Sequence, residues 1–195
     1  MTNALPFSLA GKRVWVAGHR GMVGSGLVRR LASEGCEVLA ADLSGPDGRA
    51  RVLASLDAGP APVGLVNAAG RMVVRPISEV SVEDFRSVLA ANVESTYFLC
   101  QAMATRMTSG GSIVNFSSPS AKFVATTEAS VYAVSKAAIS QVTRSFAMAY
   151  ADLPGGAIRV NALSPGIPDT PMQAGVLDQV SRARGISREE LEQGR

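Results

Sequence analysis

The sequence Gly110-Gly-Ser-Ile-Val-Asn-Phe-Ser-Ser118, followed after a loop by Tyr132-Ala-Val-Ser-Lys136, is the stretch around which the chain is organised. Its first part, from residue 111 to residue 118, is a short apolar run, which predicts a β-strand that ends on a hydroxyl side chain. Residues 129–150 have the pattern of a long helix. Side chains four residues apart share one face of a helix, so we expect the Lys136 ammonium beside the Tyr132 phenol.

These three polar side chains predict one reaction. Ser118 would hydrogen-bond a carbonyl or alcohol oxygen, Tyr132 would move its proton, and Lys136 would lower the pKa of Tyr132. A phenol titrates near pH ~10, and a positive charge roughly 4 Å away contributes on the order of 4 kcal/mol at an effective dielectric of ~20. The same spacing also occurs in helices where the Tyr packs and the Lys is solvated. Because none of the three accepts a hydride, a redox reaction requires a dinucleotide site elsewhere in the chain.

Length and composition favour one globular domain spanning residues 1–195. The chain is 47% hydrophobic and 18% charged, which excludes disordered and collagen-like classes. The net charge of +3 comes from scattered Lys and Arg residues, which argues against a nucleic-acid partner. The two cysteines, Cys36 and Cys100, form no disulfide or metal pattern, so we expect a reducing, cytoplasmic setting. No export signal or membrane span is expected, and the single histidine, His19, predicts neither a Ser-His-Asp triad nor a metal site.

A glycine loop follows the first predicted strand. The run Val14-Trp-Val-Ala17 ends at Gly18-His-Arg-Gly21-Met-Val-Gly24, which opens an amphipathic helix. Glycine lets the backbone turn tightly and approach a pyrophosphate, whose charge is favoured at the start of a helix. A plain strand-to-helix turn also favours glycine, but the position after the first strand points to a dinucleotide. We expect the cofactor to contact Gly18, Arg20, Gly21, Met22 and Gly24.

A second predicted strand, residues 37–42, ends on Asp42. This carboxylate follows Gly24 at the spacing at which a dinucleotide fold places the acid that binds the adenosine ribose. A turn or helix-capping Asp is the alternative, because Ser44-Gly-Pro-Asp-Gly48 follows immediately.

The remaining elements alternate between helix and strand. Residues 46–57 predict a helix, and residues 63–70 predict a buried strand that ends in small residues, against which a cofactor could lie. Residues 81–107 predict a long helix with Asn92 inside it, either a surface or capping amide or an amide held to bind a water near Lys136. A strand at 158–162 and a Pro-rich loop at 164–172 follow, at the edge where ligands bind in open α/β sheets. The polar end of the chain, from residue 176 to residue 195, predicts a short surface helix or a mobile end.

Taken in order, several of these motifs resemble the short-chain dehydrogenase/reductase family over roughly residues 11–175. The resemblance implies a Rossmann fold, a Ser-Tyr-Lys site with an Asn-bound water, and dimers or tetramers packed through the two long helices. Ser118 rather than Ser117 matches, because the family's Asn-x-Ser-Ser places the second hydroxyl at the site. The resemblance assigns catalysis to Ser118, Tyr132, Lys136 and Asn92. It adds as cofactor-binding residues Asn67, Ala68, Ala69, Gly70, Tyr132, Lys136, Pro165, Gly166 and Thr170, the last near the nicotinamide amide.

The chain departs from the family pattern in three places. The glycine spacing is similar to that of the extended, nucleotide-sugar-modifying branch, in particular to GDP-fucose synthases. Asp42 and Asn67 lie too close in the sequence for the usual helix-strand-helix, so we expect one helix to cross directly to the next strand, which deletes an edge strand and gives a flavodoxin-like order. The segment after Asp42 also resembles bacterial 3α-hydroxysteroid dehydrogenase-type enzymes, in which case Asp42 would face adenine. Finally, the chain stops where the family still has a helix and a last strand, so a segment covering the substrate would be missing or shortened.

Three functions follow from these observations. The first is an NAD(P)-dependent alcohol dehydrogenase or ketone reductase, acting on a small secondary alcohol or ketone. The second is a non-catalytic dinucleotide-binding or interaction protein, and the third is an NADP-dependent nucleotide-sugar reductase or epimerase. NAD is the expected cofactor and NADP the second choice, since Asp42 would repel the extra phosphate of NADP more strongly than Arg20 would attract it.

Overall fold

The computed structural model describes residues 8–41, 50, 52, 54, 55, 59–124, 126–166 and 171–193. Its centre is a parallel sheet of five strands in the order β2-β1-β3-β4-β5. This is the flavodoxin-like order expected from the short spacing after the second strand, and in the described part of the chain the sheet ends at β2 on one side and at β5 on the other. The strands are β1 (Arg13–Ala17), β2 (Glu37–Ala41), β3 (Gly64–Asn67), β4 (Gly111–Phe116) and β5 (Ile158–Leu163).

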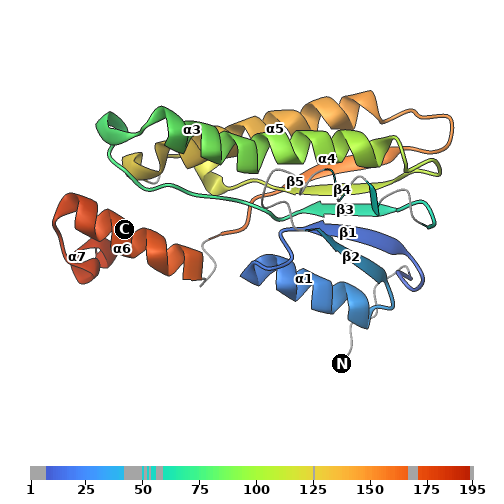
Figure 1. Cartoon of the computed structure of the whole chain (residues 1–195), viewed down its shortest axis with the longest axis horizontal. Helices are drawn as coiled ribbons and strands as arrows, with labels where there is room; N and C mark the ends of the chain where they lie inside the picture. The colour runs from blue at the N-terminus through green and yellow to red at the C-terminus, as the bar shows by residue number, and fades with distance from the viewer. Residues whose placement is uncertain are drawn as a thin grey trace.

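Helices cover both faces of the sheet, as a doubly wound fold requires. Figure 1 shows α3 (Val82–Leu89), α4 (Ser95–Ala104) and α5 (Ser130–Ala149) on one face and α1 (Met22–Ser33) on the other. The core lies between the sheet and the α4–α5 layer. Burying one such apolar side chain contributes roughly 1.5–3 kcal/mol. The core residues include Trp15, Leu65, Leu99, Met103, Ile113, Phe146 and Val160.

The long helix predicted over residues 81–107 is interrupted by a π-helical turn, η2 (Ala90–Glu94), between α3 and α4. It starts at Ser81, whose hydroxyl accepts from the Asp84 backbone N–H while the Asp84 carboxylate accepts in return. The Thr96 hydroxyl, in the first turn of α4, donates to the carbonyl of Asn92 in the π turn at 2.8 Å. The extra residue of the turn directs Asn92 inwards, where it is 1% exposed.

Two helices follow the sheet where the sequence predicted a loop and a polar end. They are α6 (Pro171–Arg184) and α7 (Arg188–Gln193). The Pro-rich loop predicted to reach residue 172 is therefore shorter, and most of the chain from residue 176 to residue 193 is helical. Val176, Leu177 and Val180 of α6 are buried. Figure 1 shows the pair beyond the carboxyl edge of the sheet, so a helical segment lies on the side where the sequence predicted a missing or shortened cover.

Some expectations fall outside the described residues. Asp42 and Thr170 are among them, and so is most of the helix predicted over residues 46–57. Within the described ranges, no helix has both the length and the apolar character that a membrane crossing requires. Nor do the described residues contain a group of three or more His, Cys, Asp or Glu side chains able to hold a metal ion.

Candidate active site

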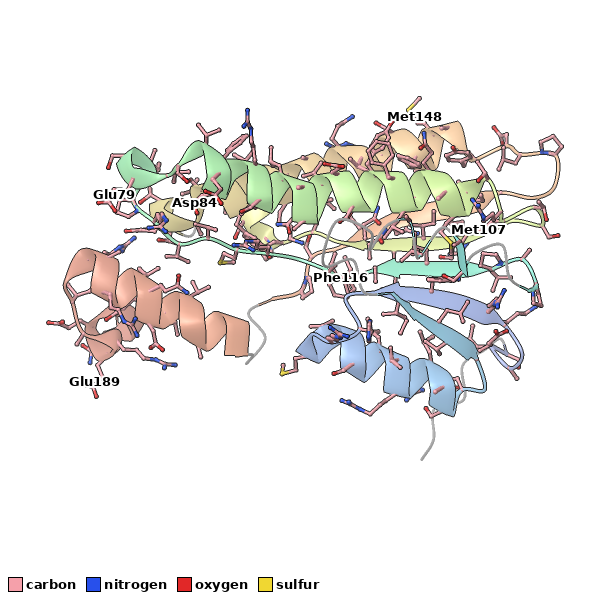
Figure 2. The ribbon with its side chains drawn as sticks, viewed as in Figure 1. Glu79, Asp84, Met107, Phe116, Met148 and Glu189 are labelled. Atoms are coloured by element: carbon pink, nitrogen blue, oxygen red, sulfur yellow. The ribbon has the colours of Figure 1, made fainter. Side chains whose placement is uncertain are left out.

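Three predicted catalytic side chains meet where β4 ends and α5 begins. Ser118 begins the short helix η3 (Pro119–Ala121), accepting the Ser120 N–H, and its hydroxyl is hydrogen-bonded to Tyr132. The Lys136 ammonium lies 5.4 Å from the centre of the Tyr132 ring. It donates to the carbonyl oxygen of Phe116, at the end of β4, at 2.6 Å. Phe116 is labelled in Figure 2 near the centre of the molecule, which locates the site at the carboxyl edge of the sheet.

Burial controls the pKa values at this site. Burial lowers the pKa of Lys136 to about 8, because the ammonium loses its hydration. Burial also raises the pKa of the Tyr132 phenol, and the hydrogen bond with Ser118, which lowers it, does not compensate. The net pKa of Tyr132 in the protein alone is therefore raised, although the sequence predicted that Lys136 would lower it. The ammonium is aimed at a backbone carbonyl rather than at the phenol, and both groups lose hydration.

Ser117 and Ser118 have different roles despite being neighbours. The Ser117 hydroxyl is buried, donates to the Lys136 carbonyl at 3.1 Å, and lies 2.9 Å from the Ser140 hydroxyl. Ser117 thus holds the back of α5 against β4, whereas Ser118 reaches Tyr132. The geometry supports the choice of Ser118.

Asn92 lies beside Lys136 and holds the backbone that follows β3. Its amide oxygen accepts the Arg71 N–H at 2.7 Å, and its amide nitrogen donates to the Arg71 carbonyl at 2.9 Å and to the Ser135 hydroxyl at 2.8 Å. A Cβ on Gly70 would stand 3.7 Å from the Lys136 ammonium and 3.8 Å from the Asn92 amide oxygen. Asn92 is therefore not a surface amide, and a water held between Asn92 and Lys136 remains a prediction.

Two glycines of the glycine loop are required by the fold, because a side chain at either position would clash with the backbone. Gly18 has a φ of +83°, and a Cβ there would stand 2.4 Å from the Ala69 nitrogen. A Cβ on Gly24 would stand 2.1 Å from the Gly18 carbonyl oxygen. These two glycines let the start of α1 pack against the ends of β1 and β3, which places the N-terminus of α1 at the carboxyl edge.

Gly21 differs from both. It precedes α1 with a φ of −72°, which any residue adopts, and the nearest atom to a Cβ there is the Gly18 oxygen at 3.4 Å. No side chain caps this end of α1, and its first turn carries no acidic residue. The free N–H groups and the helix dipole fit a phosphate, and Gly21 leaves the space for its approach.

We therefore expect Gly21→Ala to leave the stability of the protein nearly unchanged and to weaken dinucleotide binding by at least about tenfold, a difference of ~1.4 kcal/mol. Thermal unfolding and fluorescence titration with NADH measure the two effects. Gly26→Ala is the matched control, because a Cβ on Gly26 meets nothing within 4 Å in the middle of α1. Unchanged NADH affinity in Gly21→Ala would remove the loop from the cofactor site.

Asn67 does not face the cofactor site. Its side chain is buried and donates to the Asn115 amide oxygen at 2.8 Å and to the Cys100 sulfur at 3.4 Å. The Asn115 amide in turn donates to Thr143 at 3.0 Å, so these residues join β3 and β4 to α5. The Asn67 side chain therefore points into the core, because β3 continues through this residue, and the assignment of Asn67 to the cofactor stays a prediction.

The other predicted cofactor residues lie along the same edge or outside the described residues. Ala68 continues from β3, its N–H donating to the Ala17 carbonyl at 3.0 Å, and Ala69 packs on Gly18. Arg20 and Met22 are exposed at the start of α1. Pro165 and Gly166 follow the end of β5. The placement of Asp42 and Thr170 is not described.

One residue of the site was missed. Ser135 is fully buried, and its hydroxyl joins Asn92 to the Tyr132 carbonyl, to which it donates at 2.7 Å. A serine inside a helix has no sequence signal for this role, because its partner stands 43 positions away.

Comparisons with known proteins give one family match and several relatives. A family model described as Enoyl-(Acyl carrier protein) reductase matches residues 4–192. D-threitol dehydrogenase of Mycolicibacterium smegmatis is 34% identical, over 83% of this chain and 72% of that protein. The match to 3-beta-hydroxysteroid dehydrogenase of Comamonas testosteroni, 36% identical, covers 64% of this chain but only 47% of that enzyme. The chain thus spans less than half of some of its curated relatives.

Solved structures have the same fold. A putative NAD(P) dependent gluconate 5-dehydrogenase from Beutenbergia cavernae, with bound NADP at low occupancy, gives a TM-score of 0.80 at 29% identity, covering 93% of this chain and 83% of that one. A short chain dehydrogenase from Leptospira borgpetersenii with bound NAD+ gives a TM-score of 0.75 at 26% identity, covering 88% and 77%.

A short local match is to an enzyme of another kind. GDP-L-fucose synthase of Sinorhizobium fredii is 67% identical over 36 residues, which are 18% of this chain and 12% of that enzyme. The glycine loop resembles enzymes of this name, whereas the family model covers nearly the whole chain.

The sheet, the site at its carboxyl edge and these relatives define an oxidoreductase of the doubly wound α/β class. The chain belongs to the short-chain dehydrogenase/reductase family.

Proposed function

We propose that the protein exchanges a hydride between NAD(H) and a secondary alcohol or ketone. The observation that carries this proposal is the half-buried Tyr132, hydrogen-bonded to Ser118 and with the Lys136 ammonium 5.4 Å from its ring, at the carboxyl edge of the sheet. Reduction of a carbonyl requires a hydride for the carbon atom and a proton for the oxygen atom, and a phenol can give that proton. The bound dinucleotide supplies the hydride, and the chain supplies the proton and the orientation.

In ketone reduction, the Tyr132 phenol gives its proton to the carbonyl oxygen while the Ser118 hydroxyl donates a hydrogen bond to the same oxygen. Because burial raises the pKa of Tyr132, the phenol is protonated at neutral pH and ready to act as an acid. In alcohol oxidation Tyr132 must first lose that proton, so oxidation is favoured at alkaline pH. Lys136, whose pKa is about 8, orients the site through the Phe116 carbonyl and supports the deprotonated phenol while it is charged.

The chain's own residues fit a dinucleotide at this edge. The N-terminus of α1 and the space left at Gly21 fit the pyrophosphate. The backbone of Ala68, Ala69 and Gly70 would lie under the cofactor, since Gly18 brings that backbone against the glycine loop. Tyr132 and Lys136 would bind the ribose next to the nicotinamide, with Pro165, Gly166 and Thr170 beyond it.

NAD is the proposed cofactor, on the argument that Asp42 follows β2 directly. A carboxylate close to the extra phosphate of NADP costs on the order of several kcal/mol, whereas an exposed Arg20 gains ~1 kcal/mol or less. We expect catalytic efficiency with NAD to exceed that with NADP by at least about tenfold. Steady-state kinetics on a panel of secondary alcohols and ketones with both cofactors measures it, and Asp42→Ser should relax the preference.

The same panel tests the proposed function. Reduction of at least one ketone by NADH, lost in the Ser118→Ala variant, supports an oxidoreductase. Dinucleotide binding without turnover of any compound would favour the alternative of a non-catalytic binding protein. Preference for NADP in the unmodified protein would show that Asp42 does not face the ribose.

We also propose a homodimer or homotetramer. Large apolar side chains stay exposed on the outer face of α4 and α5, and Figure 2 shows Met148 there. An apolar groove of ≈ 410 Å³, lined in part by Phe85, Val131 and Val134, adjoins this face between α3 and α5. The exposed fractions are 42% for Phe85, 42% for Tyr97, 51% for Val134 and 84% for Met148.

Light scattering at micromolar concentration is therefore expected to give at least twice the monomer mass, because this much apolar surface favours burial against a symmetry mate. Met148→Glu should weaken the assembly, and Ala32→Glu, on the opposite face of the sheet in α1, should not. A monomer in the unmodified protein would refute this proposal.

A further inference from the structure

A bidentate ion pair joins α6 to the segment that leads into α5, the helix that carries Tyr132 and Lys136. The Arg184 Nε lies 2.7 Å from Oε1 of Glu128, and its Nη2 lies 2.8 Å from Oε2. The same Nη2 donates to the Thr126 hydroxyl at 3.1 Å, and that hydroxyl also donates to the Glu128 carboxylate. The Glu128 side chain is only 10% exposed. Bidentate guanidinium–carboxylate pairs of this kind fix both distance and orientation.

Glu128 stands at a junction of three segments. It belongs to the short helix η4 (Thr127–Ala129), which leads directly into α5, four residues before Tyr132. Its backbone carbonyl accepts the Arg75 N–H at 2.9 Å. Arg75 lies on the segment after β3, where the Arg71 backbone is held by Asn92. The residue whose carboxylate binds α6 is therefore connected through its backbone both to α5 and to the segment that follows β3.

Polar contacts also join α6 to α7, and we refer to the two helices as the α6–α7 unit. The Arg188 guanidinium of α7 lies 3.5 Å from the Asp178 carboxylate of α6. Ser187 and Glu190 cap the start of α7 reciprocally, at 2.8 and 3.1 Å. The unit leaves the carboxyl edge after β5 and reaches Glu128 at Arg184, so it spans the side of the site that faces away from the sheet (Figure 1).

We propose that Glu128 and Arg184 are positioning residues that fasten the α6–α7 unit over the substrate side of the site and thereby set the affinity for the alcohol or ketone. This role rests on the proposed function. The pair touches neither the glycine loop nor the Tyr132 hydroxyl, so it should act on KM and leave dinucleotide binding and proton transfer unaffected. Because Arg184 holds the pKa of Glu128 at about 2, the pair stays charged across the working pH range and its effect should not depend on pH.

The test compares Arg184→Gln with Arg182→Gln, an exposed arginine two positions earlier on the same helix. Hydrogen exchange on the protein without substrate is expected to be at least about tenfold faster over residues 171–193 in Arg184→Gln and unchanged in Arg182→Gln. In steady-state kinetics, KM for the ketone should rise about tenfold in Arg184→Gln, with kcat and the NADH dissociation constant within about twofold. Arg184→Lys, which keeps one charged contact, should restore part of both effects.

Equal exchange in the two Gln variants would overturn the proposal, and so would a rise in KM matched by Arg182→Gln. Glu128→Gln removes the same pair from the other side and must reproduce the exchange result, which guards against a folding defect specific to one variant. The exchange measurement requires no turnover. A protein that reduces no ketone would refute the proposed function, but the exchange result would still show whether the ion pair fastens the α6–α7 unit.

Discussion

Replacing Tyr132 by Phe is expected to lower kcat on the order of a thousandfold while the dissociation constant for NADH stays within about threefold. The substitution removes one hydroxyl, which is the proton donor, and general acid catalysis contributes roughly 10²–10⁴-fold. The glycine loop and the start of α1 are untouched, so the binding of the pyrophosphate should not change. Steady-state kinetics and fluorescence titration on the same preparation measure both quantities.

The matched control is Tyr150→Phe, directly after the last residue of α5. The Tyr150 ring stacks on Phe146 with the ring centres 5.7 Å apart, and this contact does not involve the hydroxyl. Turnover in this variant should be unchanged. If Tyr132→Phe lost NADH binding and turnover to the same extent, the phenol would be holding the cofactor rather than moving a proton.

Lys136→Met is expected to abolish most turnover and to remove a pH dependence from the stability of the protein. The pKa of Lys136 falls from 10.5 to about 8 on burial, so between these values the unfolded chain binds more protons than the folded one. Stability from this group therefore rises as the pH increases from about 8 to about 10.5, by up to about 3 kcal/mol. Below about pH 8 the folded protein lacks this stability, because it must keep the Lys136 ammonium charged in a buried position.

Urea unfolding at pH 7 and pH 10.5 measures this difference. At pH 7 the Met variant should be more stable by about 1–2 kcal/mol, since relief of the buried charge exceeds the loss of a donor to the Phe116 carbonyl. Lys122→Met, at an exposed position, serves as the control and should keep the pH dependence. A Met variant whose stability still rises with pH like that of the unmodified protein would show that Lys136 is not the group responsible.

The strand order could be predicted because it follows from chain length. The stretch between Asp42 and Asn67 has room for one crossover only, and the order β2-β1-β3-β4-β5 is the result. The pairing of Tyr132 with Lys136 was predictable for a similar reason, since helical spacing is local. The position of Ser118, two residues after β4, could be predicted from the end of that strand alone.

What the sequence did not reveal depends on contacts between distant residues. The π turn at Asn92 forms where an amide reaches Arg71 and Ser135, which are 21 and 43 positions away. The raised pKa of Tyr132 depends on how much of α5 is covered, which no local pattern specifies. The extent of α6 was missed because its buried residues Val176, Leu177 and Val180 are too few for a clear helical period.

The π turn also constrains how this gene can vary in length. An α-helix advances about 100° per residue, so inserting or deleting one residue in a regular stretch such as α4 would rotate everything after it by that angle. A π turn instead holds one extra residue, so deleting one residue within 90–94 would restore a regular helix and leave Leu99, Cys100 and Met103, all at most 1% exposed, facing the sheet. The same deletion would remove the feature that directs Asn92 inwards, so its cost should fall on the site rather than on the core.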